Sequence, residues 1–265
     1  MDTPEHRYVP DPIPLNLERR LGPDKGSLRE FVAIGDIMPG KAAILGEGFS
    51  GEVVRQRVNF LYERDGELHE YEDVLAIKYY RHERLFEPDL SPRQQAEQEF
   101  NSYCIARDAG LPVLPICLLD RTKPIVAMYD YSEDGKFAVT SLANESTAGK
   151  KREKVETIRN LEDTCRKLLA CAAKAANAGM TLSNSTILFR VPMNTEKNVQ
   201  LQFVLADFGE FVHKTDATSE EKKQILQFNE RRLAEALQGW IEDNMLPSTM
   251  GVHLLTVNGI MRRVL

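Results

Sequence analysis

Three stretches of the sequence carry the residue types that bind phosphate groups and their accompanying metal ion. Residues 46–53 read Gly-Glu-Gly-Phe-Ser-Gly-Glu-Val, Lys78 ends the run Leu-Ala-Ile-Lys, and Asp207 stands between an apolar run and Phe-Gly. Glycine lets the backbone approach phosphate closely, an ammonium group neutralises it, and a carboxylate binds Mg²⁺. The three stretches therefore predict a site for a nucleotide phosphate chain.

The glycine-rich stretch lies between two apolar segments, which predicts a strand, a loop and a second strand. Gly46, Gly48 and Gly51 would let the loop close over phosphates where a Cβ would clash. The dinucleotide-binding version of this spacing must open a helix. The β-branched Val53 and Val54 follow instead, which excludes that version. A loop without any ligand is the alternative.

Lys78 lies in an apolar strand, two residues after Ala76. A buried ammonium group needs an anionic partner, and Glu97 and Glu99 of the next expected helix are candidates. Two alternatives stay open, since Lys78 can extend from an edge strand to water and Glu99 can be a solvated helix acid. For Asp207 the alternative is a turn residue that binds no metal.

The sequence pattern also predicts the elements that position these residues. Asp65-Gly66 favours a tight hairpin between two strands. Ser91-Pro92 begins a helix that Gly110 closes, and Thr218 with Glu221 forms a capping box. The expected strands cover 42–54 with its loop, 55–62, 72–80, 113–118, 125–131, 187–189 and 203–206, and the expected helices cover 92–109, 155–178 and 219–243, with Leu233, Leu237 and Trp240 as the buried side of the last.

Taken in order, the glycine loop, the strand lysine and Asp207-Phe208-Gly209 resemble the signature set of protein kinases. The helix around Glu99, followed by Ala-Gly-Leu-Pro, resembles that of RIO kinases and aminoglycoside-phosphotransferase-like proteins. This resemblance implies that Glu99, rather than Glu97, is the partner of Lys78. The resemblance implies an α+β, bilobal protein-kinase-like fold with a β-rich N-lobe and a reduced, mainly helical C-lobe. It divides the chain into an extended arm (1–28), the N-lobe (29–131), a hinge or insert (132–150) and the C-lobe (151–265).

The same resemblance implies ATP and Mg²⁺ as cofactors, with Lys78 and Asp207 as catalytic residues. Asp207 would hold the metal, and Asn184 is a candidate second ligand. The residues implied in nucleotide binding are Gly46, Gly48, Ser50, Gly51, Val53, Ala76, Lys78 and Glu99.

The sequence departs from the kinase pattern in the loop that would carry the catalytic base. Alignment on Thr186-Ile187-Leu188 puts Thr181 at the general-base position and Thr186 at the position of the second metal ligand. A threonine hydroxyl does not accept a proton near neutral pH. The tail after Gly209 also lacks Ala-Pro-Glu. These departures predict a pseudokinase, or a very weak kinase, that acts as a nucleotide-responsive regulator or scaffold.

Two other functions stay open. The first is an active atypical enzyme, which would be a kinase of a protein or small molecule or a nucleotidyl transferase. It stays open because phosphoryl transfer depends chiefly on positioning and charge neutralisation. An α+β interaction module without a nucleotide site is the second.

The overall composition restricts the partners and the compartment. A net charge of −6 and a pI near 5.5 argue against nucleic acid as a partner, and the sequence shows no signal peptide or membrane span. Cys104, Cys117, Cys165 and Cys171 have no metal-binding spacing and predict reduced thiols in a cytoplasmic protein. We expect a protein partner or protein substrate, and the oligomeric state stays open.

Overall fold

Within the described residues the protein is an α+β protein, as its sequence predicts. It has four helices and mainly antiparallel sheets. The chain divides into two compact units, the first formed by Met1–Phe100 with Leu114–Tyr131 and the second by Asn101–Val113 with Ser132–Leu265. The computed structural model describes residues 28–37, 43–48, 51–64, 67–80, 90–120, 124–133, 135–140, 152–194, 197–210 and 212–261. The predicted arm at 1–28 lies almost wholly outside the described residues.

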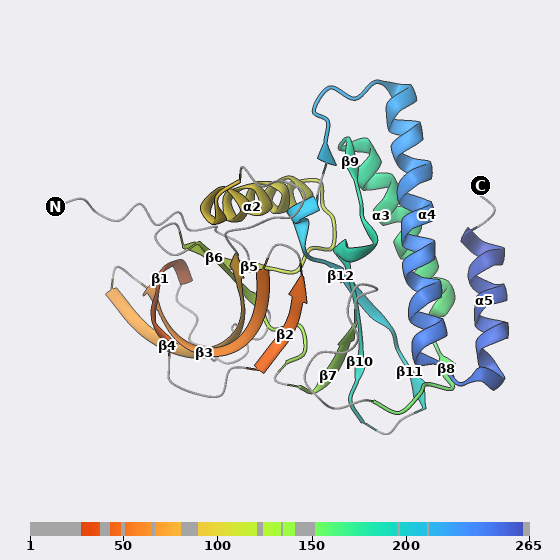
Figure 1. Cartoon of the computed structure of the whole chain (residues 1–265), viewed down its shortest axis with the longest axis horizontal. Helices are drawn as coiled ribbons and strands as arrows, with labels where there is room; N and C mark the ends of the chain where they lie inside the picture. The colour runs from red at the N-terminus through yellow and green to blue at the C-terminus, as the bar shows by residue number, and fades with distance from the viewer. Residues whose placement is uncertain are drawn as a thin grey trace. The chain divides into compact units, whose positions relative to one another are not determined.

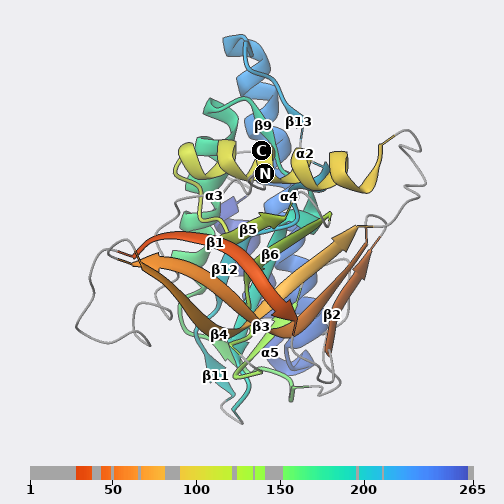
Figure 2. The same ribbon diagram turned by 90° about the vertical axis from the view of Figure 1, so that its left-hand side faces the viewer.

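The first unit contains a six-stranded sheet in the order β1-β3-β4-β6-β5, with β2 paired to β3. The long strand β3 pairs with β2 near its start and with β1 near its end, and Figure 2 shows β1, β3 and β4 as long curved strands. The strands are β1 (Leu28–Ile37), β2 (Ala43–Gly48), β3 (Gly51–Arg64), β4 (Glu67–Tyr80), β5 (Ile116–Asp120) and β6 (Ile125–Tyr129).

Both predicted hairpins of this sheet are present. Gly48 pairs with Gly51 across the β2–β3 turn, and Arg64 pairs with Glu67 across the turn that contains Asp-Gly. Strand β1 was not predicted, because its pairing with β3 shifts register in three places and this breaks the alternation that marks a strand in sequence.

Helix α2 (Pro92–Asp108) begins and ends where its sequence predicts. Ser91 Oγ accepts a hydrogen bond from Gln94 N at 3.3 Å, and Ser91 N donates to Gln94 Oε1 at 2.9 Å. Gly110 has a φ of 70°, which glycine adopts without strain at a helix end. The first half of α2 belongs to the first unit and the second half to the second unit.

The second unit combines a three-stranded sheet, β12-β10-β7, with helices α3, α4 and α5, which pack against one another (Figure 1). Buried residues such as Leu168, Leu233 and Leu237 form its core. Its elements are β7 (Phe137–Thr140), β8 (Thr157–Ile158), α3 (Leu161–Asn177), β9 (Met180–Thr181), the 3₁₀ turn η1 (Asn184–Thr186), β10 (Ile187–Pro192), β11 (Asn198–Val199), β12 (Gln202–Leu205), the 3₁₀ turn η2 (Phe208–Glu210), β13 (Val212–His213), α4 (Ser219–Asn244) and α5 (Pro247–Met261).

Helix α3 begins later than its sequence pattern predicts. Val155 and Ile158 fit the helical spacing and are buried, but Val155 forms a bridge with Met245 and Ile158 lies in β8. The side chain of Asn160 binds the backbone N and O of Leu201, both at 2.9 Å. These contacts keep residues 155–159 out of the helix, so tertiary pairing overrides the helical pattern.

Three further differences concern elements with weak periodicity. Strand β7 lies within 132–150, where no strand was predicted, and β5 begins at Ile116 rather than at Val113. Helix α5 was not predicted, because its apolar residues lie on all sides and no charged face marks the helix. Among the described helices, none is both long and apolar enough to cross a membrane.

The thiols in α3 are structural. Cys165 and Cys171 are 0% and 2% exposed, and burial raises the pKa of Cys165 to about 11 and that of Cys171 to about 12. Because the thiolate is the reactive form, both thiols stay unreactive near neutral pH.

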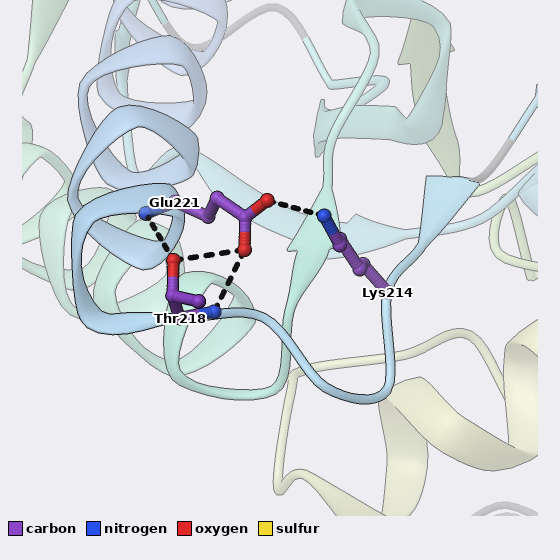
Figure 3. Close-up of polar contacts among 3 residues, drawn as sticks. All are labelled: Lys214, Thr218 and Glu221. Carbon is purple, nitrogen blue, oxygen red and sulfur yellow. Dashed lines mark hydrogen bonds and ion pairs between the residues drawn. The ribbon is translucent and has the colours of Figure 1, made fainter.

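The capping box of α4 is present and is extended by a lysine (Figure 3). Thr218 Oγ1 accepts from Glu221 N at 3.3 Å, and Glu221 Oε2 accepts from Thr218 N at 2.8 Å. Lys214 Nζ donates to Glu221 Oε1. These hydrogen bonds lower the pKa of Glu221 from 4.5 to about 2, and the bond from Lys214 has the largest effect.

Replacing Glu221 with Gln should therefore destabilise the protein in a pH-dependent way. The folded-state pKa is the lower one, so the carboxylate stabilises the fold fully above about pH 4.5 and loses this effect as the pH falls towards 2. Urea unfolding of wild type and Glu221→Gln from pH 7 to 2.5 should show the difference in unfolding free energy shrinking. The neighbouring Glu220→Gln variant is the control, and a difference that does not change with pH would contradict this assignment.

Candidate functional site

The residues predicted to form the site divide between the two units. Gly46, Gly48, Gly51, Val53, Ala76, Lys78 and Glu99 lie in the first unit, and Thr181, Asn184 and Asp207 lie in the second. Ser50 lies outside the described residues, as does the side chain of Asn184.

The glycine hairpin has a steric requirement at Gly51. A Cβ on Gly51 would lie 1.9 Å from the carbonyl oxygen of Tyr79, so only glycine fits where β3 begins beside the end of β4. The sequence predicts that Gly51 lets the backbone approach a phosphate group closely. In the structure, the packing of β3 beside β4 already requires glycine at this position. Gly46 and Gly48 lie on β2, opposite Val53 and Gly51.

Lys78 forms a buried ion pair with Glu99. Its Nζ lies 2.7 Å from Glu99 Oε2, and the two residues are 4% and 1% exposed. Tyr80 Oη donates to the same oxygen at 2.7 Å. Glu97 instead pairs with Arg93 at 3.2 Å on the outer side of α2. Lys78 therefore does not extend to water, and Glu99 is the acid that it contacts, as the sequence predicts.

A second ion pair lies on the same face of the sheet. Cross-strand pairing puts Lys78 opposite Val53, and it puts Arg55 opposite Ala76 one row further along. Side chains directly opposite each other share a face. Arg55 Nε lies 2.9 Å from Asp130 Oδ2, and both side chains are largely buried. Sequence reasoning missed this pair, because only the register reveals that the two side chains meet.

Asp207 occupies an unusual backbone conformation at the end of β12. Its φ is 55°, in the left-handed region, and its side chain is exposed. Aspartate enters this region more readily than most residues, and such outliers concentrate at functional sites. The next residue, Phe208, is 2% exposed and packs edge-on against the ring of Tyr103 at 6.0 Å. The buried aromatic fixes the chain immediately after the exposed carboxylate.

The hydroxyl groups at the predicted catalytic positions are occupied by local hydrogen bonds. Thr181 Oγ1 donates to the carbonyl oxygen of Val212 at 3.3 Å. Thr186 Oγ1 accepts from Ser183 N at 3.3 Å and lies 2.9 Å from Ser183 Oγ, which closes η1. Thr186 is 1% exposed. Neither threonine supplies a carboxylate-like base, and Thr186 stabilises the turn.

The loop that contains Thr181 is held by Asn229 of α4, which the sequence did not single out. Leu182 N donates to Asn229 Oδ1 at 2.8 Å, and Asn229 Nδ2 donates to the carbonyl oxygen of Met180 at 2.9 Å. Asn229 is fully buried. A single amide therefore fixes both sides of Thr181.

The metal ligands stay a prediction. Over the part of the chain that the structure describes, no group of three or more His, Cys, Asp and Glu side chains is placed to hold a metal ion. Mg²⁺ usually takes one or two carboxylates together with phosphate oxygens and water. Asp207, with Asn184 as a second oxygen ligand, fits this need in number and chemistry.

Removing the charge of Glu99 should strongly destabilise the fold. In a Glu99→Gln variant the buried ammonium of Lys78 loses its counter-ion, which costs about 3–5 kcal/mol of unfolding free energy. Glu97→Gln, on the exposed side of the same helix, should cost less than about 1 kcal/mol. Urea denaturation at neutral pH measures both. Equal effects of the two substitutions would show that the Lys78–Glu99 pair does not stabilise the folded chain.

In comparisons with known proteins, no protein-family model and no curated protein matches this chain. A function for this chain must therefore be inferred from the residues and contacts described above.

Proposed function

We propose that the chain is a protein-kinase-like protein that binds ATP and Mg²⁺ and catalyses little or no phosphotransfer. The buried Lys78–Glu99 ion pair carries this proposal, because it lies in the row of residues next to the glycine hairpin. In the proposed site Lys78 and the hairpin bind the phosphates, and Asp207 binds the magnesium ion.

The surroundings of Lys78 favour a phosphate ligand. Glu99 and Tyr80 hold the ammonium group on one side and fix its position. A positioned lysine ammonium binds phosphate oxygens as a point charge. Val53 and Ala76, on the same face, offer an apolar surface for the rest of a nucleotide.

The loop around Thr181 supports weak activity or none. A general base must accept the proton of the attacking hydroxyl group, and Thr181 instead donates its own proton to Val212. A protein that binds nucleotide without transferring phosphate can still change its conformational populations on binding. We therefore propose a regulator or scaffold that presents a nucleotide-dependent surface to a protein partner.

One observation favours the second candidate, an active atypical phosphotransferase. The lysine–glutamate pair that active protein kinases require is fully formed here. Phosphoryl transfer relies mainly on positioning and charge neutralisation, so slow transfer without a carboxylate base is chemically reasonable. The acceptor would be a protein or a small molecule, and a nucleotidyl transfer would use the α-phosphate instead.

Binding of MgATP should stabilise the protein against heat. At concentrations about 100 to 1,000 times Kd the gain is roughly 2–4 kcal/mol, because ligand binds only the folded state. Thermal unfolding of Lys78→Ala and Asp207→Ala, each compared with its own ligand-free sample, should show a much smaller gain. Asp216→Ala, at an exposed turn of the second unit, is the control. No stabilisation of wild type would favour an interaction module without a nucleotide site.

Phosphotransfer should be weak or undetectable. Incubating the full chain with ATP labelled at either the α- or the γ-phosphate, with Mg²⁺ and candidate acceptors, should leave both protein and acceptors almost unlabelled. Label transfer that Asp207→Ala abolishes would refute the pseudokinase assignment. The position of the transferred label would then distinguish a kinase from a nucleotidyl transferase.

A further inference from the structure

Tyr80 is the second side chain that binds the carboxylate of Glu99. It lies on β4 two residues after Lys78, so the two side chains project from the same face of the sheet. The Tyr80 hydroxyl group donates to Glu99 Oε2 at 2.7 Å, and Lys78 Nζ lies at the same distance from the same oxygen. Tyr80 is 8% exposed. One buried carboxylate oxygen therefore has a charged donor and a neutral donor.

The backbone of Tyr80 also lies beside the glycine hairpin. Tyr80 is opposite Gly51 in the pairing of β3 with β4, and Lys78 is opposite Val53. A Cβ on Gly51 would come within 3.1 Å of the Tyr80 Cα atom, so the two backbones are in close contact. Lys78 Nζ lies 5.4 Å from the centroid of the Tyr80 ring. Tyr80 is thus a neighbour of both the ion pair and the strand that follows the hairpin.

Glu99 needs a second donor when Lys78 takes part in ligand binding. In the proposed function the ammonium group of Lys78 contacts phosphate oxygens, which weakens its attraction to Glu99. The charge of the phosphate groups also repels the carboxylate. Glu99 is 1% exposed, so water does not replace the interaction that is weakened, and a buried charge without hydrogen bonds is costly.

We infer that Tyr80 is a positioning residue for nucleotide binding, because its hydroxyl group holds the Glu99 carboxylate in place while Lys78 is shared with phosphate. This inference rests on the proposed function and adds a residue to its phosphate site. The hydroxyl group stabilises the nucleotide-bound arrangement more than the free one, since in the free protein Lys78 alone already neutralises Glu99. Its removal should therefore weaken nucleotide binding in a protein that stays folded.

Calorimetric titration of the full chain with MgATP tests this inference. Tyr80→Phe keeps the aromatic ring and removes only the hydroxyl group. MgATP should bind this variant about tenfold more weakly than wild type, the effect expected for one hydrogen bond to a charged group.

Tyr79→Phe is the matched control. Tyr79 Oη donates to a neutral partner, Gln56 Oε1, at 2.8 Å, and Tyr79 projects from the other face of the same strand. This variant also loses one tyrosine hydrogen bond, but MgATP should bind it as tightly as it binds wild type.

A spectroscopic measurement separates positioning from a merely structural role. Fluorine NMR of a chain with 3-fluorotyrosine in place of Tyr80 reports on changes next to the hydroxyl group. Saturation with MgATP should shift this signal, because Lys78 moves relative to the oxygen that it shares with Tyr80. The signal of 3-fluorotyrosine in place of Tyr79 should not shift. Since the hydroxyl group is retained, this measurement decides the question alone if Tyr80→Phe does not fold.

The possible outcomes separate this inference from the proposed function. Equal affinity of wild type and Tyr80→Phe for MgATP, or an unchanged fluorine signal at position 80, would overturn the role of Tyr80 and leave the proposed function standing. Equal weakening by Tyr79→Phe and Tyr80→Phe would overturn it as well, because the contact with Glu99 would then have no particular effect. Absence of MgATP binding by folded wild type would overturn both the inference and the proposed function.

Discussion

The buried contact between Lys78 and Glu99 sets the main constraint on the first unit. An ammonium and a carboxylate group that are 4% and 1% exposed are tolerated only when each lies against the other with good geometry. Strand β4 must therefore place Lys78 on one face of the sheet, and α2 must present Glu99 to that face. The cap at Ser91 and the steric requirement at Gly51 serve this arrangement, because they fix where α2 begins and how closely β3 approaches β4.

The opposite face of the same strands has a different role. Val54, Leu75 and Ile77 alternate with the charged-face residues and are 6%, 5% and 0% exposed, so they belong to the apolar core. This alternation lets one strand contribute to the core and to a polar site at once. A one-residue change of register would move Arg55 and Lys78 to the face of Val54 and Ile77, so the two ion pairs require this register.

Local signals made much of this structure predictable from the sequence. The hairpins, the limits of α2 and the capping box of α4 each depend on residues within a few positions of one another. The choice of Glu99 over Glu97 depends instead on the resemblance of its helix to that of RIO kinases, and the contact with Lys78 agrees with it. The contacts of Arg55 with Asp130 and of Asn229 with the loop at Thr181 depend on distant segments, and no short motif announces them. Strand β1 and helix α5 were missed because bulges and uniform apolarity remove the periodicity that predicts such elements.

Asn229 also determines when the loop around Thr181 acquires its shape. The two hydrogen bonds that fix this loop come from a side chain 47 and 49 residues further along the chain. Until α4 has been synthesised and has docked, the side chain of Asn229 cannot bind the carbonyl oxygen of Met180 and the N–H group of Leu182. The contacts that Asn229 makes with this loop can therefore form only after α4 has docked.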